Sequence, residues 1–279
     1  MCVLREPVHG PVRGLVVHVP AFAEEMNKSR RMVAWAAREL AAAGLRVLVV
    51  DPLGCGDSAG DFEDASWEAW REDVRAAVDW LARDAGGRAK GGSFAPLPLW
   101  LWGLRAGALV ACAALPSLPR DTSLLLWQPV ASGRQHLAQF LRLAIGADGL
   151  ATGAERSQTA RLRNELAQGR SVEIGGYRLA PALAAGMEAA SLEVPDDFRG
   201  TVTWIEVGGD DGAEPAPASR SSIAGLRAAG TKVSERVVVG PRFWQTVEIE
   251  DCPALVEATV FMLATSDDDA ALDRARAAV

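Results

Sequence analysis

Short apolar runs recur along this chain and alternate with segments of helical periodicity. Runs that predict β-strands lie at Gly14–Val19, Leu45–Asp51, Leu97–Trp102, Ser123–Gln128, Thr201–Val207 and Ser234–Val239. Most of them are apolar throughout rather than alternately apolar and polar. Continuous apolar runs are typical of parallel strands that are buried on both faces.

Helical patterns fill the spaces between these runs. Lys28 to Ala43 repeats apolar residues on one face, and Ser66 can cap a helix that begins at Trp67. Ala106–Leu115 and Pro253–Leu263 predict two more helices. The alternation of strands and helices predicts an α/β fold with a mostly parallel central sheet and helices on both faces.

One region interrupts the alternation. From Ala131 to about Pro195 the chain has helical patches and a short "SVEIGGYRLA" segment, but no run that resembles a core strand. An insertion between two strands, placed over their carboxyl ends, would form a lid or cap. We therefore expect a single domain over residues 1–279 with a helical cap at about 131–195.

Composition limits the classes of partner and the cellular compartment that we expect for this chain. The net charge of −7 argues against nucleic acid as the main partner, because phosphate contacts need a basic face. The four cysteines contain no CxxC pair, which favours reduced thiols. The apolar stretch Leu97–Leu115 is interrupted by Arg105, which would be costly at the centre of a membrane span. We expect a cytoplasmic protein without a membrane span or bound metal, and the oligomeric state stays open.

The segment Gly103-Leu104-Arg105-Ala106-Gly107 joins a predicted strand to a predicted helix. In a nucleophile elbow, glycines at these two positions let strand and helix pack closely and hold the middle residue at a strained, exposed point. The alternative is an ordinary turn whose glycines serve packing only. The matching order of strands and helices on both sides favours the elbow.

Four stretches carry a family resemblance: "HVPAFAEEMNKSRRM", "DPLGCGDSAGDF", "LWGLRAGALVA" and "PRFWQTVEIEDCPAL". Together they resemble the exosortase A system-associated hydrolase 2 group of the α/β-hydrolase superfamily, from about His18 to Leu255. The resemblance implies an α/β-hydrolase fold with a cap. It also implies a hydrolase linked to bacterial exopolysaccharide and exosortase systems. Because no P-loop or dinucleotide fingerprint appears in the sequence, we expect no cofactor.

The usual catalytic triad of that superfamily is incomplete in this sequence. The serine position falls on Arg105, whose guanidinium is permanently protonated and cannot attack a carbonyl. The acid position falls within Gly208–Asp211, where we prefer Asp210. The loop after Val239, which should hold the histidine, reads "GPRFWQTVEIE". A degenerate Ser-Asp-His triad is therefore predicted, and a standard serine mechanism is not expected.

Other residues could supply the chemistry. Cys55 with His18 as its base would form a Cys-His pair, although a buried structural cysteine is the simpler interpretation. Glu24 and Glu25 follow the strand that leads to the oxyanion-hole loop at Phe22 and Ala23. One glutamate could activate water while Arg105 holds an oxygen, or it could form a salt bridge that only stabilises the fold. Asn27 or Ser29 could cap the helix that follows.

The elbow also predicts an anion site. The N–H of Ala106 and the positive end of the helix point toward the pocket, and Arg105 adds a full charge. Two hypotheses follow. The chain is a noncanonical hydrolase or acyl-transfer enzyme for an ester or thioester, or it is a catalytically inactive homologue that binds an anionic small molecule or a protein partner at Arg105.

Overall fold

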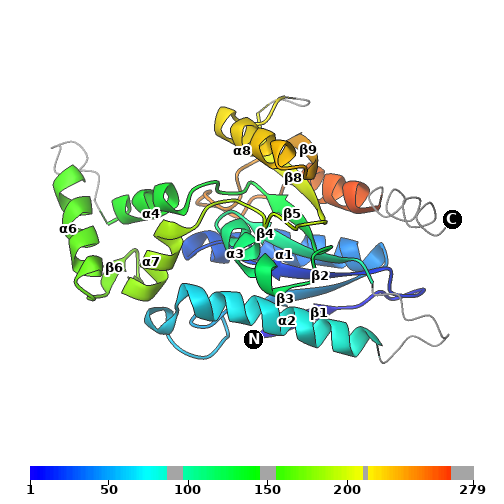
Figure 1. Cartoon of the computed structure of the whole chain (residues 1–279), viewed down its shortest axis with the longest axis horizontal. Helices are drawn as coiled ribbons and strands as arrows, with labels where there is room; N and C mark the ends of the chain where they lie inside the picture. Colours follow the sequence, from blue (N-terminus) through cyan, green and yellow to red (C-terminus); the bar gives the residue numbers. More distant parts are fainter. Residues whose placement is uncertain (87–96, 145–154, 210–212, 265–279) are drawn as a thin grey trace.

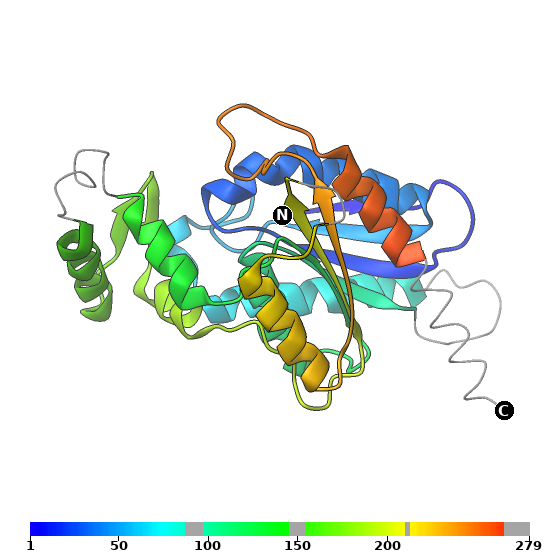
Figure 2. The same cartoon turned by 90° about the horizontal axis from the view of Figure 1, so that it is seen from above.

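A twisted seven-stranded sheet forms the centre of the molecule (Figures 1 and 2). The computed structural model describes residues 1–86, 97–144, 155–209 and 213–264. The strands of the central sheet are β1 (Cys2–Arg5), β2 (Gly14–Val19), β3 (Leu45–Val50), β4 (Leu99–Leu104), β5 (Ser123–Trp127), β8 (Thr201–Gly208) and β9 (Lys232–Val239). Their order is β1-β3-β2-β4-β5-β8-β9, and every neighbouring pair is parallel except β1 with β3.

Helices cover both faces of this sheet. The larger helices are α1 (Glu24–Ala42), α2 (Trp67–Gly86), α3 (Gly107–Ala114) and α8 (Pro217–Ala228), with a last helical segment over residues 253–264. Helix α1 and the last segment pack on one face, in a core cluster with Trp102 and Trp127. Helices α2, α3 and α8 pack on the other face. Figure 2 shows the two layers on opposite sides of the strands. The predicted layered α/β architecture is therefore confirmed.

Between β5 and β8 the chain leaves the sheet. This β5–β8 insertion contains α4 (Gly133–Arg142), α6 (Glu155–Ala167), the two-stranded sheet β6 (Val172–Ile174) and β7 (Tyr177–Leu179), and α7 (Pro181–Ala189). Its buried side chains, such as Leu137 and Leu183, belong to the same core cluster as those of α2 and α3. The insertion extends from one end of the sheet (Figure 1).

Several predicted boundaries differ from the structure. The six predicted strands are present, but β1 was not predicted because Cys2–Arg5 is short and exposed at the sheet edge. Helix α1 begins at Glu24 rather than Lys28, so Asn27 and Ser29 lie inside it and do not cap it. Two glutamates in the first turn favour this earlier start because they interact with the positive end of the helix dipole. The predicted cap at Ser66 is present, since the Ala69 N–H donates to its hydroxyl at 3.1 Å.

The glycines of the β4–α3 turn allow a very close approach between strand and helix. A Cβ built on Gly107 would lie 2.3 Å from the Val19 carbonyl oxygen, and one on Gly103 would lie 2.6 Å from the Ala108 Cα. Both contacts involve backbone, which cannot move aside as a flexible side chain can. The elbow geometry therefore depends on these two residues.

We expect Gly107→Ala to lower the free energy of unfolding by about 2–3 kcal/mol, because the new methyl group overpacks the turn. Chemical denaturation measures this change. Gly225→Ala is the matched control: it also lies in a helix, but a Cβ there meets nothing within 4 Å. That substitution should stabilise the protein by about 0.5–1 kcal/mol. Similar effects at both positions would contradict the close packing at Gly107.

Candidate functional site

Arg105 occupies the sharp turn between β4 and α3. Its φ of 54° lies in the left-handed region, which non-glycine residues rarely adopt. The Arg105 N–H donates to the Trp127 carbonyl at 3.0 Å, and the Arg105 carbonyl accepts from Val130 at 3.3 Å. These bonds to the end of β5 hold the strained residue in place. The turn thus has the strand-turn-helix shape of a nucleophile elbow.

The Arg105 guanidinium pairs with Glu25 from the first turn of α1. Its Nε lies 3.2 and 3.3 Å from the two carboxylate oxygens, and its Nη2 lies 3.2 Å from Oε1. The two side chains are only 13% and 17% exposed. Nη1 donates to the Gln128 carbonyl at 3.3 Å. One N–H on each Nη nitrogen has no acceptor in the described part of the chain.

Burial raises the pKa of Glu25, while the charge and hydrogen bonds of Arg105 and a hydrogen bond from Gln245 lower it in part. Desolvation is the largest effect, because a carboxylate away from water is costly even beside a cation. Glu25 is therefore easier to protonate than an exposed glutamate. Of the two adjacent glutamates, Glu25 is the one that forms an ion pair with Arg105.

Trp244 and Gln128 complete the surroundings of the guanidinium; the sequence placed Trp244 in the loop that would wall this pocket, but gave no such role to Gln128. The Arg105 Cζ lies 5.6 Å from the Trp244 ring centroid, within the range of a cation–π interaction. Trp244 and Phe243 are buried in the loop after β9, where the superfamily usually places its histidine. Gln128 has a φ of 42°, and its side-chain oxygen accepts from the Val207 N–H at 2.8 Å. Its position at the end of the predicted strand Ser123–Gln128 was the available signal.

Glu24 points to a different partner. Its carboxylate accepts from the Tyr177 hydroxyl at 3.0 Å and from the Asn27 side chain at 3.3 Å. Asn27 also donates to the Tyr177 hydroxyl at 2.8 Å. Because Tyr177 lies on β7, this network ties the β5–β8 insertion to the start of α1. Glu24 has no hydrogen bond to Arg105 among the described residues.

An aromatic cluster lies under the insertion, centred on Phe22. Its ring contacts Phe140 of α4 at 4.9 Å, Phe62 at 5.5 Å and Trp70 of α2 at 5.9 Å between centroids, all edge-on. His136 of α4 lies 6.0 Å from the same ring. Burial, with help from the charge of Arg105, lowers the pKa of His136 to about 4. The sequence offered no cue that linked His136 to Phe22 or Arg105.

The predicted oxyanion donors lie at the edges of this region. Ala23 precedes α1 with a φ of 52°, a second strained non-glycine residue. Ala106 precedes α3, and its N–H has no acceptor in the portion of the chain that the structure describes. Phe22 contributes its ring to the aromatic cluster. Whether these three residues bind an oxygen stays a prediction.

Of the acidic residues near the end of β8, Asp210 lies outside the described residues. Glu206, on the same strand, is buried. Its carboxylate accepts from the Trp204 indole N–H at 2.8 Å and from the Ala216 N–H at 3.1 Å. The Glu206 carboxylate is therefore hydrogen-bonded by groups of its own neighbourhood.

The structure gives no support to a Cys55–His18 pair. Burial, with the nearby charge of Asp51, raises the pKa of Cys55 to about 12, so the reactive thiolate is scarce at neutral pH. Burial lowers the pKa of His18 to about 3, so its ring is neutral. No hydrogen bond joins the two side chains in the described ranges. Cys55 behaves as a buried structural cysteine.

We expect a thiol reagent at pH 8 to modify only Cys2 rapidly in the folded protein, because Cys55, Cys112 and Cys252 are buried. All four cysteines should react in guanidinium chloride. Ellman's reagent with and without denaturant measures both values. A second fast thiol that disappears in Cys55→Ser would restore Cys55 as a candidate nucleophile.

Cavities of about 10, 550 and 180 Å³ in the described structure have linings that include neither Arg105 nor Glu25. Within residues 1–86, 97–144, 155–209 and 213–264, no group of three or more His, Cys, Asp or Glu residues could hold a metal ion. In the same ranges no helix combines the length and apolar character that a membrane crossing needs.

Comparison with known proteins supports the fold. No protein-family model matches the sequence, and no curated protein matches it either. The structure is similar to Est1E from Butyrivibrio proteoclasticus with bound ferulic acid, with a TM-score of 0.58 and 18% identity over 95% of this chain and 94% of that one. It is also similar to a thermostable carboxyl esterase from Bacillus coagulans (TM-score 0.53, 16% identity, 86% and 85% covered).

An α/β serine hydrolase homologue from Coxiella burnetii gives a TM-score of 0.52 at 14% identity, with 94% and 90% covered. These three matches cover between 85% and 95% of each chain. At such low identities the likeness concerns the fold. The specific family that the sequence resembles is not shown by these comparisons. This chain has the α/β-hydrolase fold, the architecture of esterases and serine hydrolase homologues.

Proposed function

We propose that this chain is a binding protein built on the α/β-hydrolase fold, which holds a small carboxylate at Arg105 and does not hydrolyse esters at the elbow. One observation carries the proposal: the residue at the elbow is an arginine paired with Glu25, not a nucleophile. A guanidinium cannot form an acyl-enzyme, because it has no free electron pair to attack a carbonyl carbon.

The choice of an anionic ligand follows from the hydrogen-bond donors at Arg105 and Ala106 that have no acceptor in the described residues. Arg105 has two N–H groups without a partner in the described residues, and the Ala106 N–H at the start of α3 is a third donor nearby. Charge-assisted hydrogen bonds to a carboxylate are stronger than those to a neutral oxygen. In this proposal the β5–β8 insertion acts as the cap that covers the bound ligand, fixed in place by Tyr177 and Glu24.

A second candidate is a noncanonical hydrolase, and the raised pKa of Glu25 favours it. A carboxyl group with a raised pKa is better matched to proton transfer near neutral pH. Glu25 would then remove a proton from water, and Arg105 would stabilise the oxyanion. The association with exopolysaccharide and exosortase systems, implied by sequence resemblance, stays a prediction for either candidate.

Ferulic acid is a suitable probe, because Est1E binds it and it is an aromatic carboxylate. We expect wild-type protein to bind ferulic acid in calorimetry and Arg105→Gln to bind it roughly 10- to 100-fold more weakly, the effect of losing a charge-assisted hydrogen bond. Glu25→Gln should bind it more tightly, because a competing carboxylate is removed. Arg31→Gln is the control. Arg31 is exposed on α1, the helix that carries Glu25, and it pairs with Asp251 instead of Glu25.

The same variants distinguish the two candidates in an esterase assay. With p-nitrophenyl acetate and butyrate, the binding proposal expects no turnover that depends on Arg105 or Glu25. Arg105→Ser should also be inactive, because the loop after β9 offers Phe243 and Trp244 where a histidine is needed. Turnover that is lost in both Glu25→Gln and Arg105→Gln would instead support the hydrolase.

A further inference from the structure

A cavity of about 180 Å³ lies between α1 and the sheet, and we call it the cavity beneath α1. Its wall comes from α1 and from β1, β2, β3 and β4, and most of it is apolar, with Met26, Val33, Val49 and Leu104 among its residues. An engineered apolar cavity of about 150 Å³ in another protein holds benzene. The cavity beneath α1 therefore has room for an apolar chain or ring of about six carbons.

Arg5 brings a positive charge to this cavity from the edge strand β1. Residues two apart on a strand share a face, and Val3 and Arg5 both line the cavity beneath α1. Cys2 and Leu4 line the cavity of about 550 Å³ beside α2 instead. Arg5 is half-buried, and its guanidinium has no acceptor among the described residues. Its register partner on β3 is Val47, whose side chain offers none.

The other charges near this cavity pair with each other. In the described part of the lining, Arg30 and Asp51 form an ion pair at 3.1 Å, and Asp51 is the one acidic residue there. Glu6 follows Arg5 along the chain but pairs with Arg46. The lining therefore carries one positive charge more than it has negative charges, and that charge is on Arg5. A cation beside an apolar wall favours a ligand that is both anionic and apolar.

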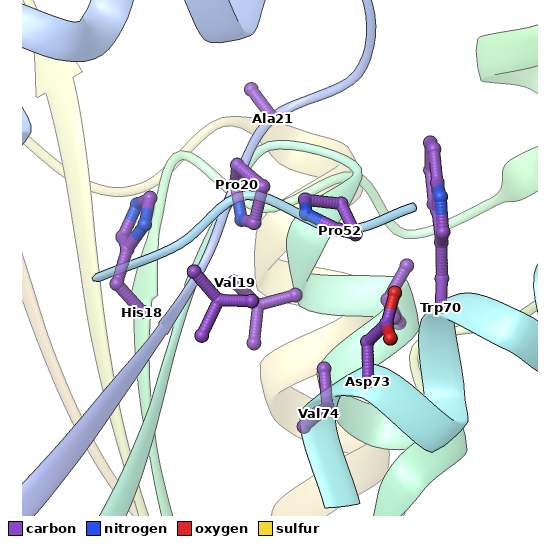
Figure 3. Close-up of a pocket in the computed structure, with 10 residues that line it drawn as sticks. His18, Val19, Pro20, Ala21, Pro52, Trp70, Asp73 and Val74 are labelled. Atoms are coloured by element: carbon purple, nitrogen blue, oxygen red, sulfur yellow. The ribbon is translucent and has the colours of Figure 1, made fainter. Parts of the chain in front are cut away.

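His18 closes the cavity on the sheet side without adding a charge or an accessible polar atom. Both of its ring nitrogens are buried, and burial lowers the pKa of His18 to about 3, so the ring is neutral at pH 7. Figure 3 shows the imidazole on one side of β2, and Trp70, Asp73 and Val74 on the other. The separate space of about 10 Å³ in that figure holds about one water molecule and is too small for an organic ligand.

We propose that the cavity beneath α1 binds a monocarboxylate with a short apolar chain, such as a fatty acid of about six carbons, and holds its carboxylate on Arg5. The charge fits, because a guanidinium forms strong charge-assisted hydrogen bonds with a carboxylate. The chain fits, because the rest of the wall is mostly apolar and each buried CH₂ group strengthens binding. This site is distinct from the elbow, since neither Arg105 nor Glu25 lines the cavity.

Hexanoate is the probe, with 1-hexanol and hexylamine as its neutral and cationic counterparts. In calorimetry at pH 7.5 we expect hexanoate to bind roughly tenfold more tightly than 1-hexanol, because Arg5 forms charge-assisted hydrogen bonds with the carboxylate only. Hexylamine should bind more weakly than either. Acetate should bind roughly 100-fold more weakly than hexanoate, because it leaves the apolar wall unfilled. Tighter binding of 1-hexanol or hexylamine than of hexanoate would overturn the proposal.

Met26 provides a direct readout from inside the cavity. Met26 belongs to the lining, whereas Met187 of α7 lies in the β5–β8 insertion. We expect hexanoate to shift the Met26 signal in a ¹H–¹³C spectrum of methionine-methyl-labelled protein and to leave that of Met187 in place. Met26→Leu and Met187→Leu assign the two signals. A Met26 signal that does not respond at millimolar hexanoate would overturn the proposal.

Variants separate the charge from the apolar wall. Arg5→Gln should weaken hexanoate binding about tenfold and leave 1-hexanol unchanged, because it removes only the charge. Ala34→Leu should abolish binding of both, because Ala34 lines the cavity and the larger side chain fills it. Arg38→Gln removes a positive charge from an exposed position of α1 outside the lining and should change neither. Arg5→Gln keeps the test valid if Ala34→Leu does not fold.

Two results contradict the proposal even when hexanoate binds. Equal weakening in Arg5→Gln and Arg38→Gln would show a general attraction of the anion to the surface rather than a site at Arg5. Loss of hexanoate binding in Arg105→Gln but not in Arg5→Gln would place the carboxylate at the elbow instead of the cavity.

Discussion

Replacing Glu25 with glutamine is expected to lower the free energy of unfolding by about 3 kcal/mol. The substitution keeps the shape of the side chain but leaves the Arg105 guanidinium, only 13% exposed, without its counter-charge. Removing one partner of a buried ion pair typically costs 3–5 kcal/mol, because the other charge stays in a poorly solvated place. The slight exposure of both side chains puts the expected value at the lower end. Urea unfolding measures it.

The double variant Glu25→Gln, Arg105→Gln should recover most of this loss, since no charge is then buried. Asp251→Asn is the control: it breaks the pair between Asp251 and Arg31 of α1, the helix that carries Glu25, but Arg31 is 63% exposed. Exposed pairs contribute about 0–1 kcal/mol, so a small effect is expected there. Equal small losses from Glu25→Gln and Asp251→Asn would contradict the buried pair at the elbow.

Acidification from pH 6.5 to pH 4 is expected to destabilise the protein strongly through two buried histidines. Burial lowers the pKa of His18 to about 3 and that of His136 to about 4, against about 6.5 in the unfolded chain. Below pH 6.5 the unfolded chain binds protons that the folded one does not, so stability falls as the pH falls. Each histidine contributes about 0.7 kcal/mol per pH unit near pH 6.5, where the unfolded ring is half protonated, and close to 1.4 kcal/mol per pH unit near pH 5.

Urea unfolding at pH 7, 6 and 5 tests this expectation. Since both buried histidines are gone, the double variant His18→Leu, His136→Leu should lose about 1.4 kcal/mol less than the wild type between pH 7 and 6, and about 2.4 kcal/mol less between pH 6 and 5. His9→Leu removes an exposed histidine and should leave the slope unchanged. A double variant that follows the wild-type slope would show that the two rings already carry protons in the folded state.

The sheet and the elbow were predictable because they rest on local patterns. Mostly apolar runs such as Leu45–Val50 and Ser123–Trp127 are typical of strands that are buried on both faces between helical layers, and both strands have parallel neighbours in the sheet. The spacing of Gly103 and Gly107 indicated a close strand–helix approach, and the backbone distances at both positions agree with it. The short strand β1 has neither a buried apolar run nor a glycine spacing, because it pairs at the edge of the sheet and is partly exposed.

The partner of Arg105 could not be chosen from sequence. Glu24 and Glu25 are adjacent, and successive side chains on a helix point about 100° apart, so the start of α1 decides which one faces the elbow. Glu25 faces it, and Glu24 faces Tyr177, which is 153 residues away along the chain. Trp244 and Gln128 likewise reach Arg105 through loops whose paths depend on tertiary packing.

The shared core beneath the β5–β8 insertion has a consequence for how the protein could be re-engineered. Phe140 and Leu183 of the insertion pack in one apolar cluster with Phe22, Trp70 and the helices α2 and α3. The insertion is therefore not a detachable module, because excising it would expose aromatic rings of the sheet domain to water. A designer could vary its outer surface and loops, whereas its inner helix faces must be exchanged together with the residues that they cover.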